Sequence, residues 1–269
     1  MKNQPLFSLL VLFFFLSIRP ASSQTIEFSM VPDSVSSLEF DHTRLLFSDT
    51  DQSIISGLFN LQYKHVLNDK FNLIGETSFM HFKESGSDAE NGISNVYLGI
   101  QYKTSKSAHI NSALNAGIHL PTSKRDAQIG QFFNFFDLGK FAHKTTAINI
   151  GYNTFINYDS GFRLGFEFGS EILIPVGSNN GDTDILGKYG VSLMYQTTSG
   201  LYFQTELLGV ANITNEGGDF DDSTFHTYAI GAGYNGDKVG AGLYYRNYFD
   251  EFFGDDFNGI LGLEINFFL

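Results

Sequence analysis

The chain has 269 residues, of which 16% are aromatic, and it contains 28 Gly, 5 Pro and no Cys. The absence of Cys excludes a disulfide framework and a lipoprotein anchor. A formal net charge of −13 argues against nucleic acid as a partner. The small number of prolines and the lack of a visible linker indicate a single domain after the amino-terminal leader.

Residues 1–23 have the layout of an export signal. Lys2 precedes an apolar run over Leu6–Ile18, and the small residues Ala21–Ser23 follow. A run of about 13 residues is too short to span a bilayer comfortably as a helix. The segment therefore indicates a signal peptide that is cleaved before Gln24, and not a membrane anchor.

Beyond Gln24 no apolar stretch reaches 18 residues, which excludes a helical membrane protein. Residues 24–37 show no clear period, and we expect a periplasmic lead-in there. From residue 38 onward, apolar and polar residues alternate with the period of two that half-buried strands require. We expect strands at about residues 38–47, 54–65, 71–82, 94–103, 108–120, 145–158, 162–174, 188–197, 201–213, 225–235, 238–247 and 258–269.

The connections between these strands alternate in length. Tight turns are expected at Asn68-Asp69, Thr104-Ser105-Lys106, Asp159-Ser160-Gly161, Thr198-Ser199-Gly200 and Gly236-Asp237. Longer connections join the strands at the ends opposite these tight turns. The loop over 48–53 is the one short connection expected at those ends. Outer-membrane barrels have short periplasmic turns and longer extracellular loops. The sequence therefore predicts an all-β fold over residues 38–269, a transmembrane antiparallel up-and-down β-barrel of about twelve strands in the outer membrane of a Gram-negative bacterium.

The charged side chains share one parity within the strands. Over 162–174, Arg163, Glu167 and Glu171 alternate with apolar residues. An Arg or Lys on the lipid face would cost roughly 2 to 4 kcal/mol at the bilayer midplane, so the charged parity must face the lumen. These groups either set the selectivity of an aqueous pore or pair with one another and close the lumen. The lumen-lining residues are expected to be Lys64, Glu76, Lys103, Arg163, Glu167, Glu171, Lys188, Glu206, Arg246 and Glu264.

The last stretch, residues 258–269, is similar to the closing strand of an outer-membrane barrel, whose aromatic carboxyl end serves as an insertion signal. Outer-membrane lipid and the barrel-assembly machinery are therefore the expected partners. Aromatic residues of the lipid-facing parity also gather at the tight-turn rim, as a periplasmic interface girdle requires. The expected girdle is Tyr63, Phe71, Tyr102, Tyr158, Phe162, Tyr195, Phe203, Tyr234 and Phe267.

The connection over 121–145 is apolar at its centre, with Phe132, Phe133, Phe135 and Phe136 close together. An extracellular loop in water has no use for four such residues. The loop either folds into the barrel mouth as a constriction or ligand platform, lies on the outer leaflet as an interfacial helix, or contacts a neighbouring subunit.

Three other loops are acidic, and they favour a solvated rim that attracts cations over a defined calcium site. Their residues are Asp182 and Asp184; Glu216, Asp219, Asp221 and Asp222; and Asp250, Glu251, Asp255 and Asp256. We expect no metal or cofactor.

A lipid hydrolase would need Ser and His together at the lipid-facing rim. His119 and Ser123 lie near the outer rim, but His119 points inward by parity and has no evident third partner. His81 with Glu84 and Ser85 is another loose group. We therefore do not expect an enzyme.

The strand Val96-Tyr97-Leu98-Gly99-Ile100-Gln101-Tyr102, a tight turn, and Ala116-Gly117-Ile118-His119-Leu120-Pro121-Thr122 form a distinctive pair. This pair resembles a hairpin of the barrel family named for the MetA pathway of phenol degradation. The resemblance implies an outer-membrane transporter, often of unestablished substrate.

The leading hypothesis is a passive channel or transporter for small solutes, including hydrophobic or aromatic ones if the Phe-rich loop is a ligand platform. A closed structural or adhesive barrel is the second hypothesis, and a lipid-modifying hydrolase is the third.

Overall fold

The computed structural model describes residues 35–47, 55–83, 86, 88–107, 109–124, 130–131, 135–177, 181–214, 223–249 and 257–269. The expected signal peptide and most of the lead-in lie outside these residues. The strands are β1 (Ser37–Phe47), β2 (Gly57–Val66), β3 (Phe71–Phe82), β4 (Glu90–Ile93), β5 (Val96–Lys106), β6 (Ile110–Leu120), β7 (Thr145–Asn157), β8 (Phe162–Pro175), β9 (Asp184–Gln196), β10 (Leu201–Asn212), β11 (Thr224–Asn235), β12 (Val239–Tyr248) and β13 (Phe257–Phe268). A short 3-10 helix, η2 (Phe135–Lys140), precedes β7.

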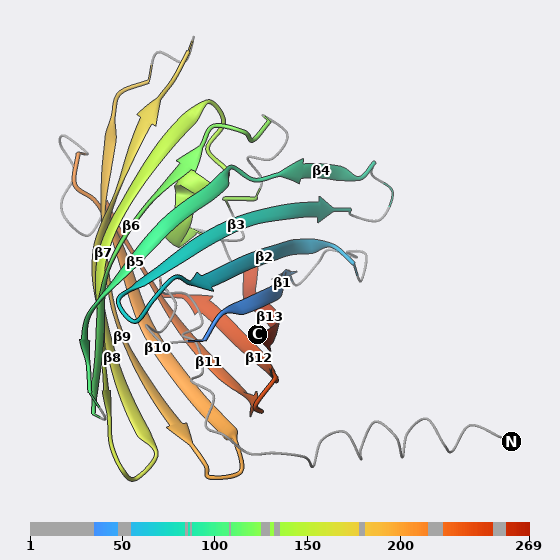
Figure 1. The fold of residues 1–269 in the computed structure, drawn as a ribbon. Coiled ribbons are helices and arrows are strands. Elements are labelled where there is room, and N and C mark those ends of the chain that lie inside the picture. The colour runs from blue at the N-terminus through green and yellow to red at the C-terminus, as the bar shows by residue number, and fades with distance from the viewer. Residues whose placement is uncertain are drawn as a thin grey trace, which may run out of the picture.

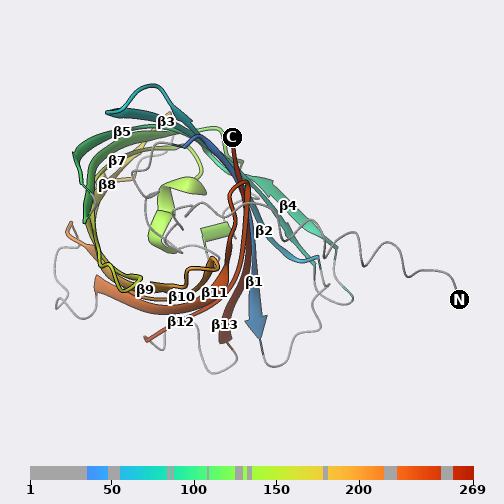
Figure 2. The same ribbon diagram turned by 60° about the horizontal axis from the view of Figure 1, so that its bottom comes forward.

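All of these strands except β4 close into an antiparallel barrel of 12 strands, as the sequence predicts (Figures 1 and 2). Each strand pairs with its neighbours along the chain, and β3 pairs with β5. The ring closes where β1 pairs with β13, with Ser37 opposite Phe268. Closure satisfies the backbone groups of both edges, which a strand structure inside a membrane requires.

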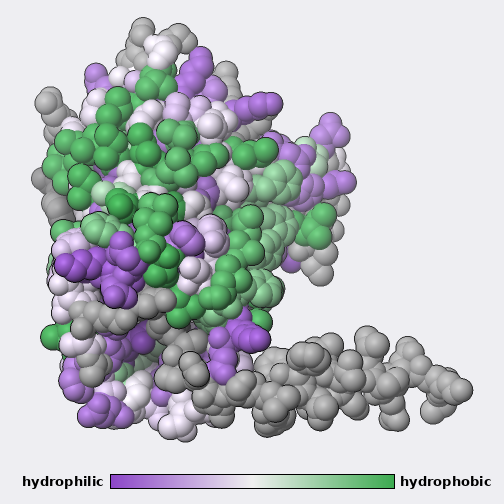
Figure 3. All heavy atoms as spheres, viewed as in Figure 1, coloured by the Kyte–Doolittle hydropathy of each residue, from purple (hydrophilic) through white to green (hydrophobic). Residues whose placement is uncertain are grey.

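The outer surface of the barrel is apolar. Phe168 and Phe203 are each 60% exposed, while their neighbours in sequence turn inward. Apolar residues cover much of the face seen in Figure 3, and hydrophilic residues gather mainly toward its two ends. Most of the expected girdle is exposed at the tight-turn ends of the strands, namely Tyr63, Tyr102, Tyr158, Phe162, Tyr195, Phe203 and Phe267. Among the described residues, no helix is long and apolar enough to cross a membrane.

Two of the tight turns depend on glycine. Gly161 and Gly200 have φ of 89° and 90°, and each donates its N–H to the carbonyl three residues earlier. This left-handed conformation has little cost only for glycine. One expected turn is wrong: Thr104–Lys106 belongs to β5, which carries a register shift between Lys103 and Ser105, and the turn follows at Ser107. The strand continues past this irregularity, where the alternation of apolar and polar residues is no longer clear in the sequence.

Strand β4 is not among the predicted strands, because its four residues are too few to show a clear alternation. It pairs with the outer end of β3, where Phe79 lies opposite Ile93. The β3–β5 pairing then resumes with Glu76 opposite Tyr97, so one extra residue lies on the β4–β5 side. This bulge, Ser94-Asn95, coincides with a bend, and the β3–β4 hairpin leans away from the barrel (Figure 1).

Candidate functional site

Many of the buried side chains of the barrel are polar. Of the ten ionisable residues expected in the lumen, Lys64, Lys103, Glu171, Glu206, Arg246 and Glu264 are buried, and Glu76, Arg163, Glu167 and Lys188 are half-buried. Glu171 is 0% exposed, Arg246 is 1% exposed and Glu264 is 8% exposed. Of the three charged residues on the inward parity of β8, Arg163 donates from Nε to Asn157 Oδ1 at 2.8 Å, and Glu171 is paired with Lys188.

Part of the Phe-rich connection lies inside the barrel. We call η2 with the two residues after it, Phe141 and Ala142, the plug; Figure 2 shows η2 within the ring of strands. Phe136 and Phe141 are buried, at 6% and 0% exposure. They pack with apolar side chains from the long-loop ends of the strands, which are Leu45, Leu58, Met80, Leu186, Leu208, Val210, Tyr248 and Ile260. The outer half of the lumen is therefore filled by a hydrophobic core.

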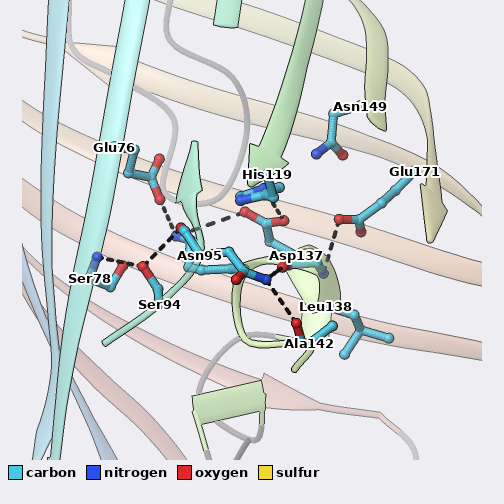
Figure 4. A network of polar contacts seen from close by, with 12 residues as sticks. Glu76, Ser78, Ser94, Asn95, His119, Asp137, Leu138, Ala142, Asn149 and Glu171 are labelled. Atoms are coloured by element: carbon cyan, nitrogen blue, oxygen red, sulfur yellow. Dashed lines mark hydrogen bonds and ion pairs between the residues drawn. The ribbon is translucent and has the colours of Figure 1, made fainter. Parts of the chain in front are cut away.

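The opposite side of the plug is held by polar contacts, and Asn95 makes the most of them (Figure 4). Its Nδ2 donates to the carbonyls of Gly139 at 2.7 Å and Ala142 at 2.9 Å, and its backbone N–H donates to that of Lys140. Its Oδ1 accepts the N–H of Ser123 at 2.7 Å. The β-bulge thus presents a side chain inward that caps the carbonyls of the short helix, which would otherwise be unsatisfied in the lumen.

Ion pairs add to this attachment. Lys140 binds Glu76 of β3, and both side chains are more than nine-tenths buried. The buried N–H of Gly139 donates to Glu171 Oε1 at 3.0 Å, and Lys188 Nζ lies 2.9 Å from Glu171 Oε2. Burial alone would lower the pKa of Lys140, but the carboxylates of Glu76 and Asp137 raise it to about 12. Lys140 is therefore charged at any physiological pH.

His119 also faces the plug. Its Nε2 lies 3.0 Å from Asp137 Oδ1, and its ring centroid is 4.8 Å from that of Tyr97. Burial would raise the pKa of Asp137, but the nearby His119, Lys188 and Lys140 hold it well below its usual range. His119 points inward, as its parity predicts. Its side-chain partner is Asp137 of the plug and not Ser123.

Below the plug, four amide side chains form a belt across four adjacent strands. Asn72 donates to Gln101 at 2.8 Å, and Gln101 donates to Asn115 at 3.0 Å. Asn115 in turn donates to Asn153 at 3.4 Å. Because each amide carries both a donor and an acceptor, the four side chains bond one another along the wall without a charge.

Several inward tyrosine rings lie against the wall, over glycines of the next strands. A Cβ at Gly117 would collide with the ring of Tyr97, and a Cβ at Gly262 would collide with that of Tyr244. The hydroxyl of Tyr244 bonds Asp41 at 3.2 Å. The absence of side chains at these glycines lets large rings lie flat, so that they occupy less of the lumen.

Some of the remaining predicted residues lie outside the part of the chain that the structure describes, and others make contacts that differ from the predicted ones. Phe132, Phe133 and the acidic loop residues Glu216, Asp219, Asp221, Asp222, Asp250, Glu251, Asp255 and Asp256 lie outside the described residues, and the side chain of Phe135 is also not described. Ser123 donates to Ala142 and does not contact His119, while His81 bonds Asn91. The histidine next to Ser123 is His143, whose Nδ1 lies 3.0 Å from the Ser123 carbonyl oxygen, and Glu84 and Ser85 lie outside the described residues.

Sequence analysis missed three residues through which the plug is held: Asn95, Asp137 and Lys140. Asn95 belongs to a bulge that alternation does not reveal, and the other contacts join segments far apart in the chain. The inward amides of the belt were visible as lumen-parity residues, but their contacts depend on strand register.

No protein-family model matches the chain, and no curated protein matches it. Its fold is similar to that of the COG4313 outer membrane channel from Pseudomonas putida F1, with a TM-score of 0.58 and 12% identity over 93% of this chain and 100% of that one. The NanC porin gives a TM-score of 0.54 at 10% identity, covering 86% and 99%. A KdgM porin in complex with disordered oligogalacturonate gives 0.53 at 8% identity, covering 86% and 98%. The chain thus has the fold of outer-membrane channels, in line with the expected location.

Proposed function

We propose that this protein is a passive channel for small solutes whose outer half is closed by a releasable plug. The observation that carries the proposal is the two-sided attachment of the plug inside a closed barrel. One side packs in the hydrophobic core, and the other is held by Asn95, Glu76 and Glu171. Below it, the lumen is lined by polar side chains, which a path for water and solutes requires.

The chemistry of the two halves supports a solute class. A solute that displaces the plug meets the apolar side chains around Phe141 first and the amide belt afterwards. Small molecules with an apolar or aromatic part and a polar group would find favourable surroundings in both. The resemblance of the β5–β6 hairpin to a transporter family supports the same proposal. No nucleotide-binding motif is present in the sequence, so the solute gradient would drive transport.

Single-channel recording in a planar bilayer tests the channel. Asn95→Ala removes three side-chain hydrogen bonds to the plug and its loop, and we expect more frequent or larger openings than in the wild type. Asn91→Ala is the matched control, because Asn91 lies in the leaning hairpin and bonds only the exposed His81.

Folding must be verified by the heat-dependent gel shift of an intact barrel. If the folded wild type, Asn95→Ala and a variant lacking the plug core all pass no current, the channel proposal is wrong and a closed structural barrel takes its place.

A further inference from the structure

Three potential metal ligands converge where the plug meets the wall. His119 comes from β6, Asp137 from η2 and Glu171 from β8, and one ligand atom of each lies within 4.8 Å of the others. Figure 4 shows the three side chains directed toward one another. His119 and Glu171 are almost completely buried, at 1% and 0% exposure.

The candidate ligand atoms are held in ion pairs. Asp137 Oδ1 lies 3.0 Å from His119 Nε2, and Glu171 Oε2 lies 2.9 Å from Lys188 Nζ. The buried Nδ1 of His119 has no hydrogen-bond partner among the described residues. The 3.0 Å between Nε2 and Asp137 Oδ1 suits two neighbouring ligands of one ion. Ligand bonds of about 2.1 Å to zinc place adjacent donors of a tetrahedral site roughly 3.4 Å apart, so these side chains would shift by a few tenths of an ångström around the ion.

The acids at this point are paired with cations of the protein. Lys140 binds Glu76, Lys188 binds Glu171 while also donating to Asn149 at 3.4 Å, and His119 Nε2 lies 3.0 Å from Asp137 Oδ1. Histidine binds a metal ion in its neutral form, so an ion that binds here takes the place of a proton on His119.

We propose that His119, Asp137 and Glu171 bind one first-row transition-metal dication, for which zinc is the best match, and that the bound ion clamps the plug to the wall. An imidazole with two carboxylates is a donor set for zinc or its neighbours, whereas calcium prefers oxygen ligands alone. Since Asp137 belongs to the plug and the other two ligands belong to β6 and β8, the ion connects the releasable plug to the fixed wall of the barrel. The clamp rests on the proposed channel function, whereas the binding site does not.

Binding is tested on the folded protein in detergent micelles, without any measurement of transport. Zinc titration by calorimetry should give one ion per chain, and cobalt should give the visible absorption of a protein-bound ion. Glu171→Gln retains an acceptor for Gly139 but removes the charge, and His119→Gln removes the imidazole. We expect each to weaken binding at least tenfold, whereas His81→Gln in the leaning hairpin should bind as the wild type does.

The site is overturned if the wild type binds no zinc, if calcium binds equally well, or if His119→Gln leaves zinc binding unchanged. The clamp is tested separately in bilayers, where zinc should lower the open probability and a chelator should restore it. Zinc that binds but leaves the current unchanged overturns the clamp. A protein that conducts current but binds no zinc overturns this inference and leaves the channel proposal standing.

Discussion

The two halves of the lumen are built on the same strands, yet they are filled by opposite chemistry. In the outer half, apolar side chains from the wall enclose Phe136 and Phe141 of the plug. In the periplasmic half, amides bond one another along the wall. Nearer the middle of the barrel, Tyr244 lies flat over Gly262. The wall alone determines the lower half, whereas the upper half depends on a segment that comes from a loop.

This difference explains how the barrel can remain folded when the plug leaves the lumen. The closed ladder of strands stabilises the cylinder independently of its contents. The plug contributes a separate core, so it can be lost without loss of the barrel. Substitutions in the outer half should therefore release the plug. Substitutions in the lower half should change only the shape of the path.

The largest effect is expected from Phe141→Ala. Phe141 is fully buried in the plug core, and truncation of a buried Phe costs about 3–5 kcal/mol. We expect the plug to leave its place and the single-channel current to rise, while the heat-dependent gel shift persists. Phe249→Ala is the control, because Phe249 is 60% exposed. A current equal to that of the wild type would show that the core does not close the lumen.

Lys140→Met should release the plug by a different route. It leaves the carboxylate of Glu76 buried without its cation, which costs about 3 kcal/mol. The chain has no Cys, so Leu138→Cys supplies a single thiol whose maleimide labelling reports plug exposure. Labelling should accelerate by about two orders of magnitude and return toward the original rate in the Glu76→Leu, Lys140→Met double variant. No recovery in the double variant would mean that the pair acts by more than charge.

Gly262→Ala tests the lower half. The new Cβ would collide with the ring of Tyr244, which must leave the wall and give up its bond to Asp41. We expect a loss of about 1–3 kcal/mol in barrel stability and a smaller current in the plug-released Phe141→Ala background. Gly75→Ala has open space around its Cβ and serves as the control. An unchanged current would show that the ring can turn without narrowing the path.

The smallest effect is expected from Gln101→Leu, which interrupts the amide belt and leaves Asn72 and Asn115 each short of one bond. Stability should fall by about 1–2 kcal/mol. The current of the plug-released protein should fall less than twofold, because the lumen keeps its other polar groups. Thr205→Leu on the outer face should change neither quantity, and an equal effect there would remove the distinction between the two faces.

Alternation along single strands was sufficient to predict the barrel. Each strand carries its own lipid and lumen faces, so Arg163, Glu167 and Glu171 could be placed without any tertiary contact. The predicted strand at 188–197 begins later than β9, which starts at Asp184, because the apolar Ile185 and Leu186 are adjacent there and blur the period. Strand boundaries depend on the partner strand, and this information is absent from a local pattern.

The plug could be predicted only as one of three alternatives. The composition of the Phe-rich connection showed that it avoids water, but not which apolar surroundings it finds. The answer lies in inward apolar residues such as Leu58, Met80 and Ile260, which occur where the lumen parity is otherwise polar. Read together, these exceptions to the alternation would have pointed to an internal partner for the loop.

The residues around Phe141 also have a consequence for the order of folding. Leu45 belongs to β1 and Ile260 to β13, so the two ends of the barrel must meet before this part of the core exists. Asn95 and Glu76, from the β3–β5 part of the wall, must be in place as well. The plug can therefore dock only after the seam between the first and last strands has formed. At that stage the lipid-facing surface is complete, and docking of the plug inside the lumen is the step that remains.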